Sequence, residues 1–238
     1  MSAPARWEAA ALALAFAVAA LVALAIAWSG PATYEAIARD HGFDRSTFRV
    51  PAGAPDASEV RHDLADWVDL HRATLRYVLG MDPAPPPAPG GQAFYGEAEA
   101  RHLADVRAVF ALATAAMWAA IVALVIVLTR AARRGAGDVL RLARSGGALA
   151  GVGVGALVLV AAIAFWPLFL AFHYVFFPQG NFLFDPATSN LVRLYPLEYW
   201  QGVTLRLLLS FVALAASVSV SAHAALRRRA RIAAARAD

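Results

Sequence analysis

The sequence predicts an all-α polytopic membrane protein with four transmembrane helices and a small extracytoplasmic helical cap domain. Its 238 residues are 60% hydrophobic, which is too apolar for an ordinary soluble domain. A helix needs about 20 apolar residues to cross the hydrocarbon core, and backbone groups in lipid must be satisfied within the segment. Four almost uncharged runs have this length: approximately Ala9–Trp28, Val106–Leu128, Ala148–Phe172 and Val203–Leu226.

Residues 1–28 are predicted to hold an N-terminal tail and the first transmembrane helix. Ala25-Ile26-Ala27 resembles the small-residue site of a cleaved signal peptide. However, the hydrophobic part of a signal peptide has only about 7–15 residues, and this apolar run is longer. We therefore expect a retained anchor, with signal-peptide cleavage as the alternative.

The charged residues predict how the spans are oriented. Residues 29–105 carry twelve acidic residues and seven arginines, whereas the loop 129–147 and the tail 227–238 each carry five arginines and one acidic residue. Positively charged loops stay in the cytoplasm. Both termini and the loop 129–147 are therefore predicted inside, and residues 29–105 and 174–202 outside. Because the arginines cluster beside the spans, no nucleic-acid partner is expected.

Residues 29–105 are predicted to form the cap, with a proline-rich linker. Ser58–Leu79 has the apolar spacing of an amphipathic helix, with Asp56 or Ser58 as its cap. Pro83–Gly91 contains too much proline to continue a helix and predicts an extended linker. So small a cap is expected to pack on the helix ends or the membrane rather than fold alone.

The rest of the chain alternates between apolar spans and polar connections. We expect the second transmembrane helix at 106–128, the third at 148–173, an aromatic outer loop at 174–202 and the fourth helix at 203–226. Pro167 is predicted to kink the third helix near its outer end, because proline removes a helix hydrogen bond and clashes with the preceding turn. A kink there would re-aim His173.

Two histidines lie where a predicted span meets the outer surface. A helix entering the second span would place His102 on one face with Glu99 and Asp105, and a neighbouring carboxylate orients an imidazole and raises its basicity. His173 ends the third span on the same side, so we expect the two imidazoles to meet. Ionisable groups at membrane depth are costly and are therefore functional candidates. The alternative is that each side chain simply reaches the interface.

Other polar groups are assigned lesser parts. The supporting candidates are Tyr95, Tyr174 and Arg193. The histidines of the acidic cap are expected to be exposed to solvent: His41, His62 and His71. An alternative zinc site would use His102, Asp105, His173 and Asp185. No tight ligand spacing supports that site, so neither metal nor cofactor is expected. Without cysteine or a Gly-x-Ser-x-Gly elbow, thiolate and serine-hydrolase chemistry find no support.

Two sequence motifs contain these histidines. The first is Glu-x-x-His-Leu-x-Asp-Val at Glu99–Val106, with Tyr95-Gly96 upstream. The second is Phe-His-x-x-Phe-Phe-Pro-x-Gly and its continuation, at Phe172–Gly180, Phe184–Pro186 and Leu194–Trp200. With four spans and an outer cap, they resemble the bacterial integral membrane family that includes the lipoprotein intramolecular transacylase (Lit). Asn181-Phe182 departs from the tryptophan that this pattern leads us to expect after the glycine.

The resemblance implies an acyltransferase of the bacterial cell membrane that acts on diacylated lipoproteins at the extracytoplasmic face. The family's transacylase moves the sn-2 acyl chain from the glyceryl group to the α-amino group of the N-terminal cysteine, giving a lyso-form lipoprotein. Its two essential histidines correspond to His102 and His173. We expect His102, oriented by Asp105 or Glu99, to act as the base toward the amine. His173 would donate to the oxyanion or the leaving oxygen, and the reversed assignment stays open.

Two alternative functions stay open beside this interpretation. One is a different lipid-modifying reaction on the same fold. The other is a non-catalytic membrane protein whose cap binds a partner. Membrane lipids are expected partners in every case.

Overall fold

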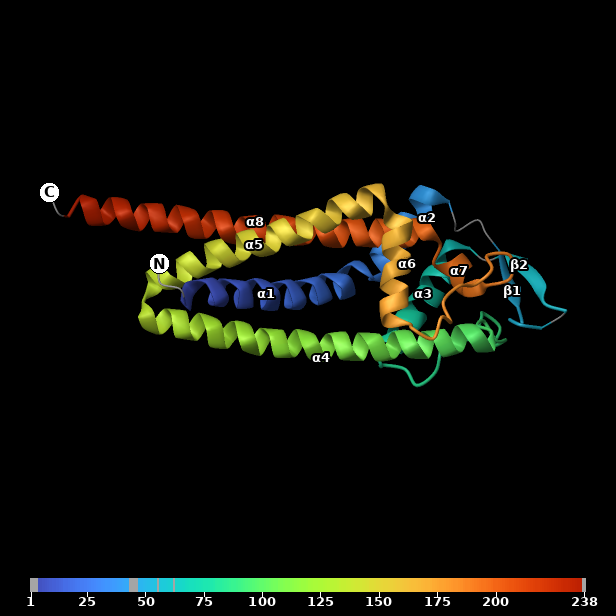
Figure 1. Cartoon of the computed structure of the whole chain (residues 1–238). Helices are drawn as coiled ribbons and strands as arrows, with labels where there is room; N and C mark the ends of the chain where they lie inside the picture. The colour runs from blue at the N-terminus through green and yellow to red at the C-terminus, as the bar shows by residue number, and fades with distance from the viewer. Residues whose placement is uncertain (1–3, 43–46, 55, 62, 237–238) are drawn as a thin grey trace. The chain divides into compact units, whose positions relative to one another are not determined.

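The computed structural model describes residues 4–42, 47–54, 56–61 and 63–236. Its elements, labelled in Figure 1, are α1 (Pro4–Trp28), α2 (Pro31–His41), β1 (Thr47–Val50), β2 (Ser58–Arg61), α3 (Leu64–Val78), α4 (Glu97–Arg134), α5 (Ala136–Ile163), α6 (Phe165–Phe176), α7 (Asn190–Leu194) and α8 (Leu197–Ala234). The chain divides into two compact units. The bundle unit comprises Met1–Ala25, Thr114–Ala162 and Leu205–Asp238, and the cap unit comprises Ile26–Ala113 and Ile163–Thr204.

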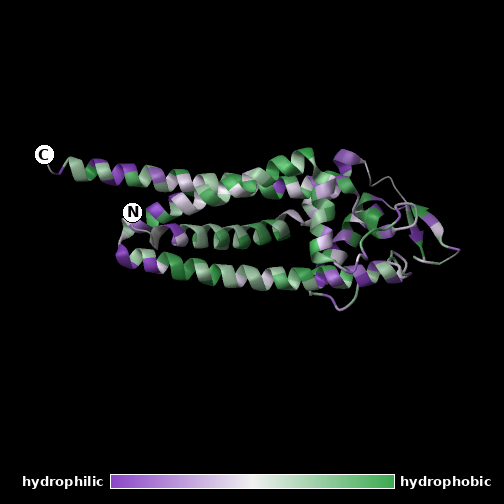
Figure 2. Cartoon of the chain, viewed as in Figure 1, coloured by the Kyte–Doolittle hydropathy of each residue, from purple (hydrophilic) through white to green (hydrophobic). Residues whose placement is uncertain are grey.

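The described residues contain four helices that are long and apolar enough to cross a membrane: α1, α4, α5 and α8. Figure 2 shows hydrophobic residues along most of each helix and hydrophilic residues toward the termini. The predicted fold class is therefore confirmed. The predicted loop 129–147 is wrong, because α4 runs to Arg134 and α5 begins at Ala136. Only Gly135 interrupts the helix there, with a φ of 126° that favours glycine.

Glycines in α5 let the helices of the bundle unit approach one another closely. A Cβ atom at Gly146 would lie 2.4 Å from Leu12 Cδ2 of α1. A Cβ atom at Gly147 would lie 3.2 Å from the carbonyl oxygen of Ala215 in α8. Small residues permit such backbone contact in lipid, where no hydrophobic force drives helices together.

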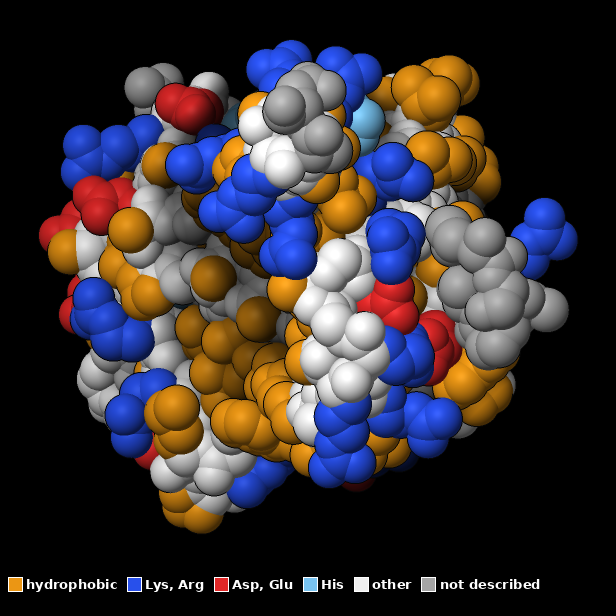
Figure 3. Space-filling model, turned by 90° about the vertical axis from the view of Figure 1, so that its left-hand side faces the viewer, with side chains coloured by type: hydrophobic (Ala, Val, Ile, Leu, Met, Phe, Trp, Pro, Cys, Tyr) orange, Lys and Arg blue, Asp and Glu red, His pale blue; other side chains and the backbone are white. Residues whose placement is uncertain are grey.

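A buried carboxylate joins α1 to α4 at the arginine-rich end of the bundle unit. Glu8 is only 3% exposed and accepts hydrogen bonds from both terminal nitrogens of Arg134, at 3.0 and 2.5 Å. Such bidentate pairs are the strong, geometrically specific form of the arginine–carboxylate contact. Figure 3 looks onto this end and shows basic side chains gathered over it.

The cap unit contains a strand pair where a helix was expected to begin. Ser58–Arg61 is β2, which pairs antiparallel with β1 and sets Val60 opposite Phe48. The prediction of a helix from Ser58 is therefore wrong. Alternating burial along β1 shows why the pair forms, since one face lies on the core. Helix α3 begins at Leu64, and its cap is Asp63, whose side chain accepts from Asp66 N at 3.0 Å.

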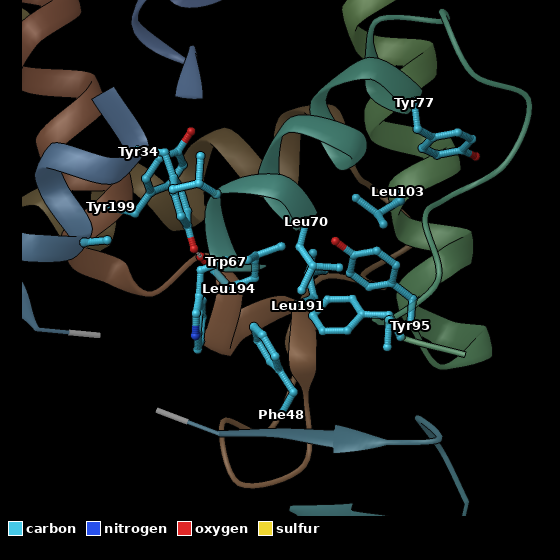
Figure 4. Close-up of a cluster of buried hydrophobic side chains, with 14 of the residues drawn as sticks. Tyr34, Phe48, Trp67, Leu70, Tyr77, Tyr95, Leu103, Leu191, Leu194 and Tyr199 are labelled. Atoms are coloured by element: carbon cyan, nitrogen blue, oxygen red, sulfur yellow. Dashed lines mark hydrogen bonds between the residues drawn. The ribbon is translucent and has the colours of Figure 1, made fainter. Parts of the chain in front are cut away.

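A continuous aromatic core holds the cap unit together (Figure 4). Phe48 of β1 lies 4.0 Å from Trp67 of α3 and 4.6 Å from Phe94, measured between ring centroids. The Tyr34 hydroxyl of α2 donates to the carbonyl oxygen of Leu194 in α7 at 3.0 Å. The same core includes residues of α4 and α8. The expectation that the cap packs on helix ends is thus confirmed.

The predicted third span, 148–173, is not one helix. Helix α5 ends at Ile163, and α6 begins at Phe165 after a non-helical Ala164 with φ −136° and ψ 50°. Pro167 is the third residue of α6, where its missing N–H removes no helical hydrogen bond. The expected kink at Pro167 is therefore a break before it. Because of this break, His173 belongs to a separate short helix of the cap unit.

Candidate active site

The two histidines predicted to meet lie near one another in the cap unit. His102 is in the second turn of α4 and His173 is near the end of α6. Their ring centroids are 6.3 Å apart and the ring planes are inclined by 18°. Both residues are buried, at 7% and 9% exposure. At this separation no ring nitrogen of one reaches the other by a direct hydrogen bond.

The tautomer of His173 is fixed by its own helix. Its Nδ1 lies 2.8 Å from the carbonyl oxygen of Phe169, which can only accept, so Nδ1 carries the proton. In the neutral ring, Nε2 is then a hydrogen-bond acceptor. The ring is held between Phe169 and Phe182, at centroid distances of 4.1 and 5.0 Å. The arrangement suits a base with a defined orientation.

His102 has a different environment. Its ring lies 4.8 Å from that of Phe177 and 5.7 Å from that of Phe184. Its Nδ1 is buried and has no hydrogen-bond partner among the residues that the structure describes. Asp105, predicted to orient His102, accepts instead from Gln179 Nε2 at 2.8 Å and from Asn181 Nδ2 at 2.7 Å.

Both imidazoles line a cavity of about 520 Å³ within the cap unit. Most of its other walls are apolar or aromatic, including Val106, Phe110, Phe169, Leu191 and Trp200. A volume of this size is in the range of small-molecule sites. The site therefore combines two buried acid–base groups with an apolar chamber.

A family sequence profile, described as lipoprotein intramolecular transacylase Lit, matches residues 58–200. The match covers more than half of the chain and includes both histidines. This chain belongs to the Lit family. It is accordingly an enzyme of the lipoprotein intramolecular transacylase kind and a multi-pass membrane protein.

Solved structures of the membrane integral lipoprotein intramolecular transacylase Lit from Bacillus cereus share the fold. One has a TM-score of 0.73 and 17% identity, and the alignment covers 96% of this chain and 98% of that one. Two variants of the same protein, with a histidine changed to arginine or alanine, each give a TM-score of 0.69 at 16% identity over 96% of this chain and 94% and 96% of theirs. Comparison with curated proteins finds no match.

In this Lit family member, Glu99 is a structural anchor at the base of the site. The carboxylate accepts from Gly96 N at 2.7 Å, closing a capping contact at the start of α4. It also accepts from Ser189 Oγ at 2.5 Å and Leu191 N at 2.8 Å. These contacts tie the loop before α7 to α4. The carboxylate is thus bonded to the loop rather than to His102.

The two supporting tyrosines interact with residues other than the histidine pair. The Tyr95 hydroxyl is buried and lies 2.6 Å from Thr74 Oγ1 in the core drawn in Figure 4. Burial raises the pKa of the Tyr95 phenol well above its ordinary value, so it stays protonated. Tyr174 is exposed, with its ring 5.2 Å from that of Phe182. The positions of both tyrosines are therefore set by packing against neighbouring side chains.

Arg193 lines the cavity, but its guanidinium is bonded within the cap. It donates to the carbonyl oxygens of Thr47 at 3.0 Å, Pro186 at 3.2 Å and Ala187 at 2.7 Å. It also donates to the Glu59 carboxylate at 2.8 Å, which lowers the pKa of Glu59. Arg193 therefore joins α7 to the strand pair.

His71 was predicted to be exposed, and this prediction is wrong. It is 1% exposed, with Nε2 2.9 Å from the carbonyl oxygen of Ser29 and Nδ1 3.1 Å from the Tyr195 hydroxyl. Its ring stacks on that of Tyr34 at 4.3 Å. The acidic composition of the cap suggested an exposed side chain, and the partners that bury His71 come from distant segments of the sequence. His41 is exposed, as predicted, and His62 lies outside the described residues.

The alternative zinc site finds no support in the part of the chain that the structure describes. No group of three or more His, Cys, Asp or Glu residues is arranged there to hold a metal ion. Asp105 faces two amides, and the Asp185 carboxylate accepts from Ala187 N at 2.9 Å within its own turn. The chemistry that these residues can supply is proton transfer.

Proposed function

We propose that this enzyme moves the sn-2 acyl chain of a diacylated lipoprotein from the glyceryl oxygen to the α-amino group of the N-terminal cysteine, using His102 and His173 as its proton-transfer pair. The observation that carries the proposal is the meeting of these two buried imidazoles, 6.3 Å apart, on one apolar cavity. The product pair is an N-acylated cysteine and a lyso-glyceryl group.

The proton balance of this reaction calls for two acceptors. An α-ammonium group has a pKa near 8, so it must lose one proton before attack and a second when the amide forms. The nitrogen attacks the ester carbonyl carbon, a C–N bond forms, and the C–O bond to the glyceryl group breaks. One proton goes to the departing glyceryl oxygen and the other to solvent. No covalent enzyme intermediate is needed.

The two imidazoles take different parts in the proposed proton transfer. His173 presents Nε2 as an acceptor, because Nδ1 donates to Phe169, and we assign it the proton of the attacking nitrogen. His102 takes the first proton from the ammonium group and returns it to the glyceryl oxygen. This assignment differs from the sequence-based expectation that His102 alone is the base. Donor and acceptor belong to one molecule, so orientation in the cavity can supply much of the rate.

The orientation in the membrane is part of the proposal. The arginines of the α4–α5 turn and the end of α8 favour the cytoplasmic side for this end of the bundle unit. Both termini would then be cytoplasmic and the cap unit extracytoplasmic. The enzyme would then bind the lipidated cysteine of its substrate at the outer leaflet of the cell membrane.

The test is to express the protein in a transacylase-free bacterial strain and analyse lipoprotein N-termini by mass spectrometry. We expect lyso-form lipoprotein with the wild type and with the exposed control His41→Ala, and none with His102→Ala or His173→Ala. Unchanged diacylglyceryl cysteine despite good expression of the wild type would refute the reaction. Full activity in either histidine variant would refute the pair.

A further inference from the structure

Two buried polar atoms next to the proposed reaction site lack hydrogen-bond partners in the described part of the chain. One is Nδ1 of His102 and the other is Oδ1 of Asn181. The two side chains lie close enough to interact. Leaving a buried donor or acceptor unpaired is energetically unfavourable. An N–H at one atom and a carbonyl oxygen at the other are complementary.

The orientation of the Asn181 amide is set from its other side. Its Nδ2 donates to the Asp105 carboxylate at 2.7 Å, and a carboxylate can only accept. This contact decides which end of the amide is nitrogen and which is oxygen. Since the two ends point apart, Oδ1 is directed away from Asp105. Gln179 Nε2 donates to the same carboxylate oxygen at 2.8 Å and helps to hold it in place.

We propose that Asn181 is a positioning residue for His102: its Oδ1 accepts the Nδ1 proton of the imidazole, and Asp105 fixes the orientation of this amide. The proposal rests on the proposed function of the histidine pair. It gives Asn181, which departs from the tryptophan expected at this position, a specific part in this member of the family. The relay runs from α4 through the loop after α6 and back to α4.

The consequence is that both imidazoles have the same tautomer. His173 donates from Nδ1 to the carbonyl oxygen of Phe169, and His102 donates from Nδ1 to Asn181. Each ring then presents an unprotonated Nε2. Two acceptors are what the loss of two protons from an α-ammonium group requires. Without the relay, the tautomer of His102 would be free to change.

The relay makes a sharp prediction for Asp105→Asn. An amide at position 105 can still accept from Asn181 Nδ2 through its oxygen, but it can also donate to Asn181 Oδ1, which turns the Asn181 amide around and directs its NH2 group at His102. In the turned orientation Nδ1 of His102 must accept, so its proton moves to Nε2. His102 should therefore lose its single tautomer and give a mixture, while the tautomer of His173 stays unchanged and serves as an internal control. Asn181→Leu, which removes the acceptor, should give a mixture of tautomers at His102.

The measurement is long-range ¹H–¹⁵N NMR of the full-length, histidine-labelled protein in detergent, at a pH where the imidazoles are neutral. Signals are assigned by comparison with His102→Gln and His173→Gln. Gln179→Leu is the matched control, because it removes a contact to Asp105 but leaves Asn181 in place. We expect it to keep the wild-type tautomer. In the same variants, Asp105→Asn should lower kcat several-fold with little change in KM, because molecules with the wrong tautomer of His102 cannot carry out proton transfer.

An Nδ1-protonated His102 that persists in both Asp105→Asn and Asn181→Leu would overturn the relay. A wild-type His102 protonated on Nε2 would overturn it as well. Failure of the proposed function looks different: either the wild type forms no lyso-form lipoprotein, or His102→Ala remains active, whatever the tautomer is. The spectra also report whether each variant is folded, so a loss of activity through unfolding is recognised.

Discussion

Two buried histidine sites line the same cavity, and they differ in how their nitrogens are used. His71 has a partner on each ring nitrogen, the Ser29 carbonyl on one side and the Tyr195 hydroxyl on the other. Because the carbonyl oxygen can only accept, Nε2 carries the proton and Tyr195 donates to Nδ1. His102 and His173 together have one such contact, from His173 to Phe169.

Burial therefore does not separate a structural histidine from a chemical one, but hydrogen bonding does. A ring bonded on both nitrogens is locked in one tautomer and has no atom left for a substrate. A ring bonded on Nδ1 alone is oriented and still keeps Nε2 available. His71 fits the first description and His173 fits the second, and the proposed contact to Asn181 would give His102 the same arrangement as His173. Substitutions at the two sites should separate stability from activity.

The largest expected effect comes from exchanging each histidine for leucine. His71→Leu leaves the Ser29 carbonyl and the Tyr195 hydroxyl without their partner and should cost about 4 kcal/mol of unfolding free energy. His102→Leu breaks only the proposed contact to Asn181, so it should cost about 1–2 kcal/mol of unfolding free energy while abolishing transacylation. Thermal unfolding in detergent, with activity measured alongside, tests both. Equal melting temperatures for the two variants would contradict the comparison.

The same contrast shows what the sequence can predict. His102 and His173 were predicted as a pair because each lies where an apolar run meets the outer surface, and topology puts both on one side. His71 gives no such signal. Its partners Ser29 and Tyr195 lie 42 and 124 residues away in the chain. Only the folded cap brings them together, so a histidine in an acidic segment was assigned to the surface.

In the fold, too, features set by a single segment were predictable from the sequence, whereas features set by contacts between distant segments were not. The four apolar helices of the described chain follow from the length and hydropathy of single segments, and their number was predicted correctly, although the third ends at Ile163 rather than near His173. The strand pair depends on contacts between β1 and β2, which a single segment does not reveal. Ser58–Arg61 was therefore predicted as part of a helix but forms β2. The break at Ala164 has no proline or glycine at its position. Likewise, the spacing of Glu99 and Asp105 around His102 indicated a direct contact, but both carboxylates are bonded to the chain after α6.

The second prediction concerns pH. Burial, helped by the nearby Arg72, outweighs the hydrogen bond to Ser29 and lowers the pKa of His71 from 6.5 to about 4. Between these values the unfolded chain binds a proton that the folded protein does not. The stabilisation is therefore complete above pH 6.5 and is lost as the pH falls toward 4, by roughly 3 kcal/mol. Unfolding curves at pH 7 and pH 4.5 should show this loss in the wild type.

The matched control for the pH experiment is His71→Leu, which cannot titrate at this position. Its melting temperature should fall less between pH 7 and pH 4.5 than that of the wild type, although it starts lower. Other carboxyl and imidazole groups contribute equally to both proteins, so the difference isolates His71. Parallel pH dependence in the two proteins would show that His71 is not the group responsible.

The smallest effect is expected from Tyr195→Phe, which removes a single hydroxyl from the His71 site. It leaves Nδ1 of His71 without its donor but keeps the contact to Ser29 and the aromatic packing, so the loss should be about 1–2 kcal/mol. Transacylation per folded molecule should stay within an order of magnitude of the wild type, because Tyr195 serves His71 rather than the pair. Unfolding in detergent and the lipoprotein mass spectrum measure the two quantities. A variant with full stability and no activity would move Tyr195 into the reaction site and remove the distinction between the two histidine sites.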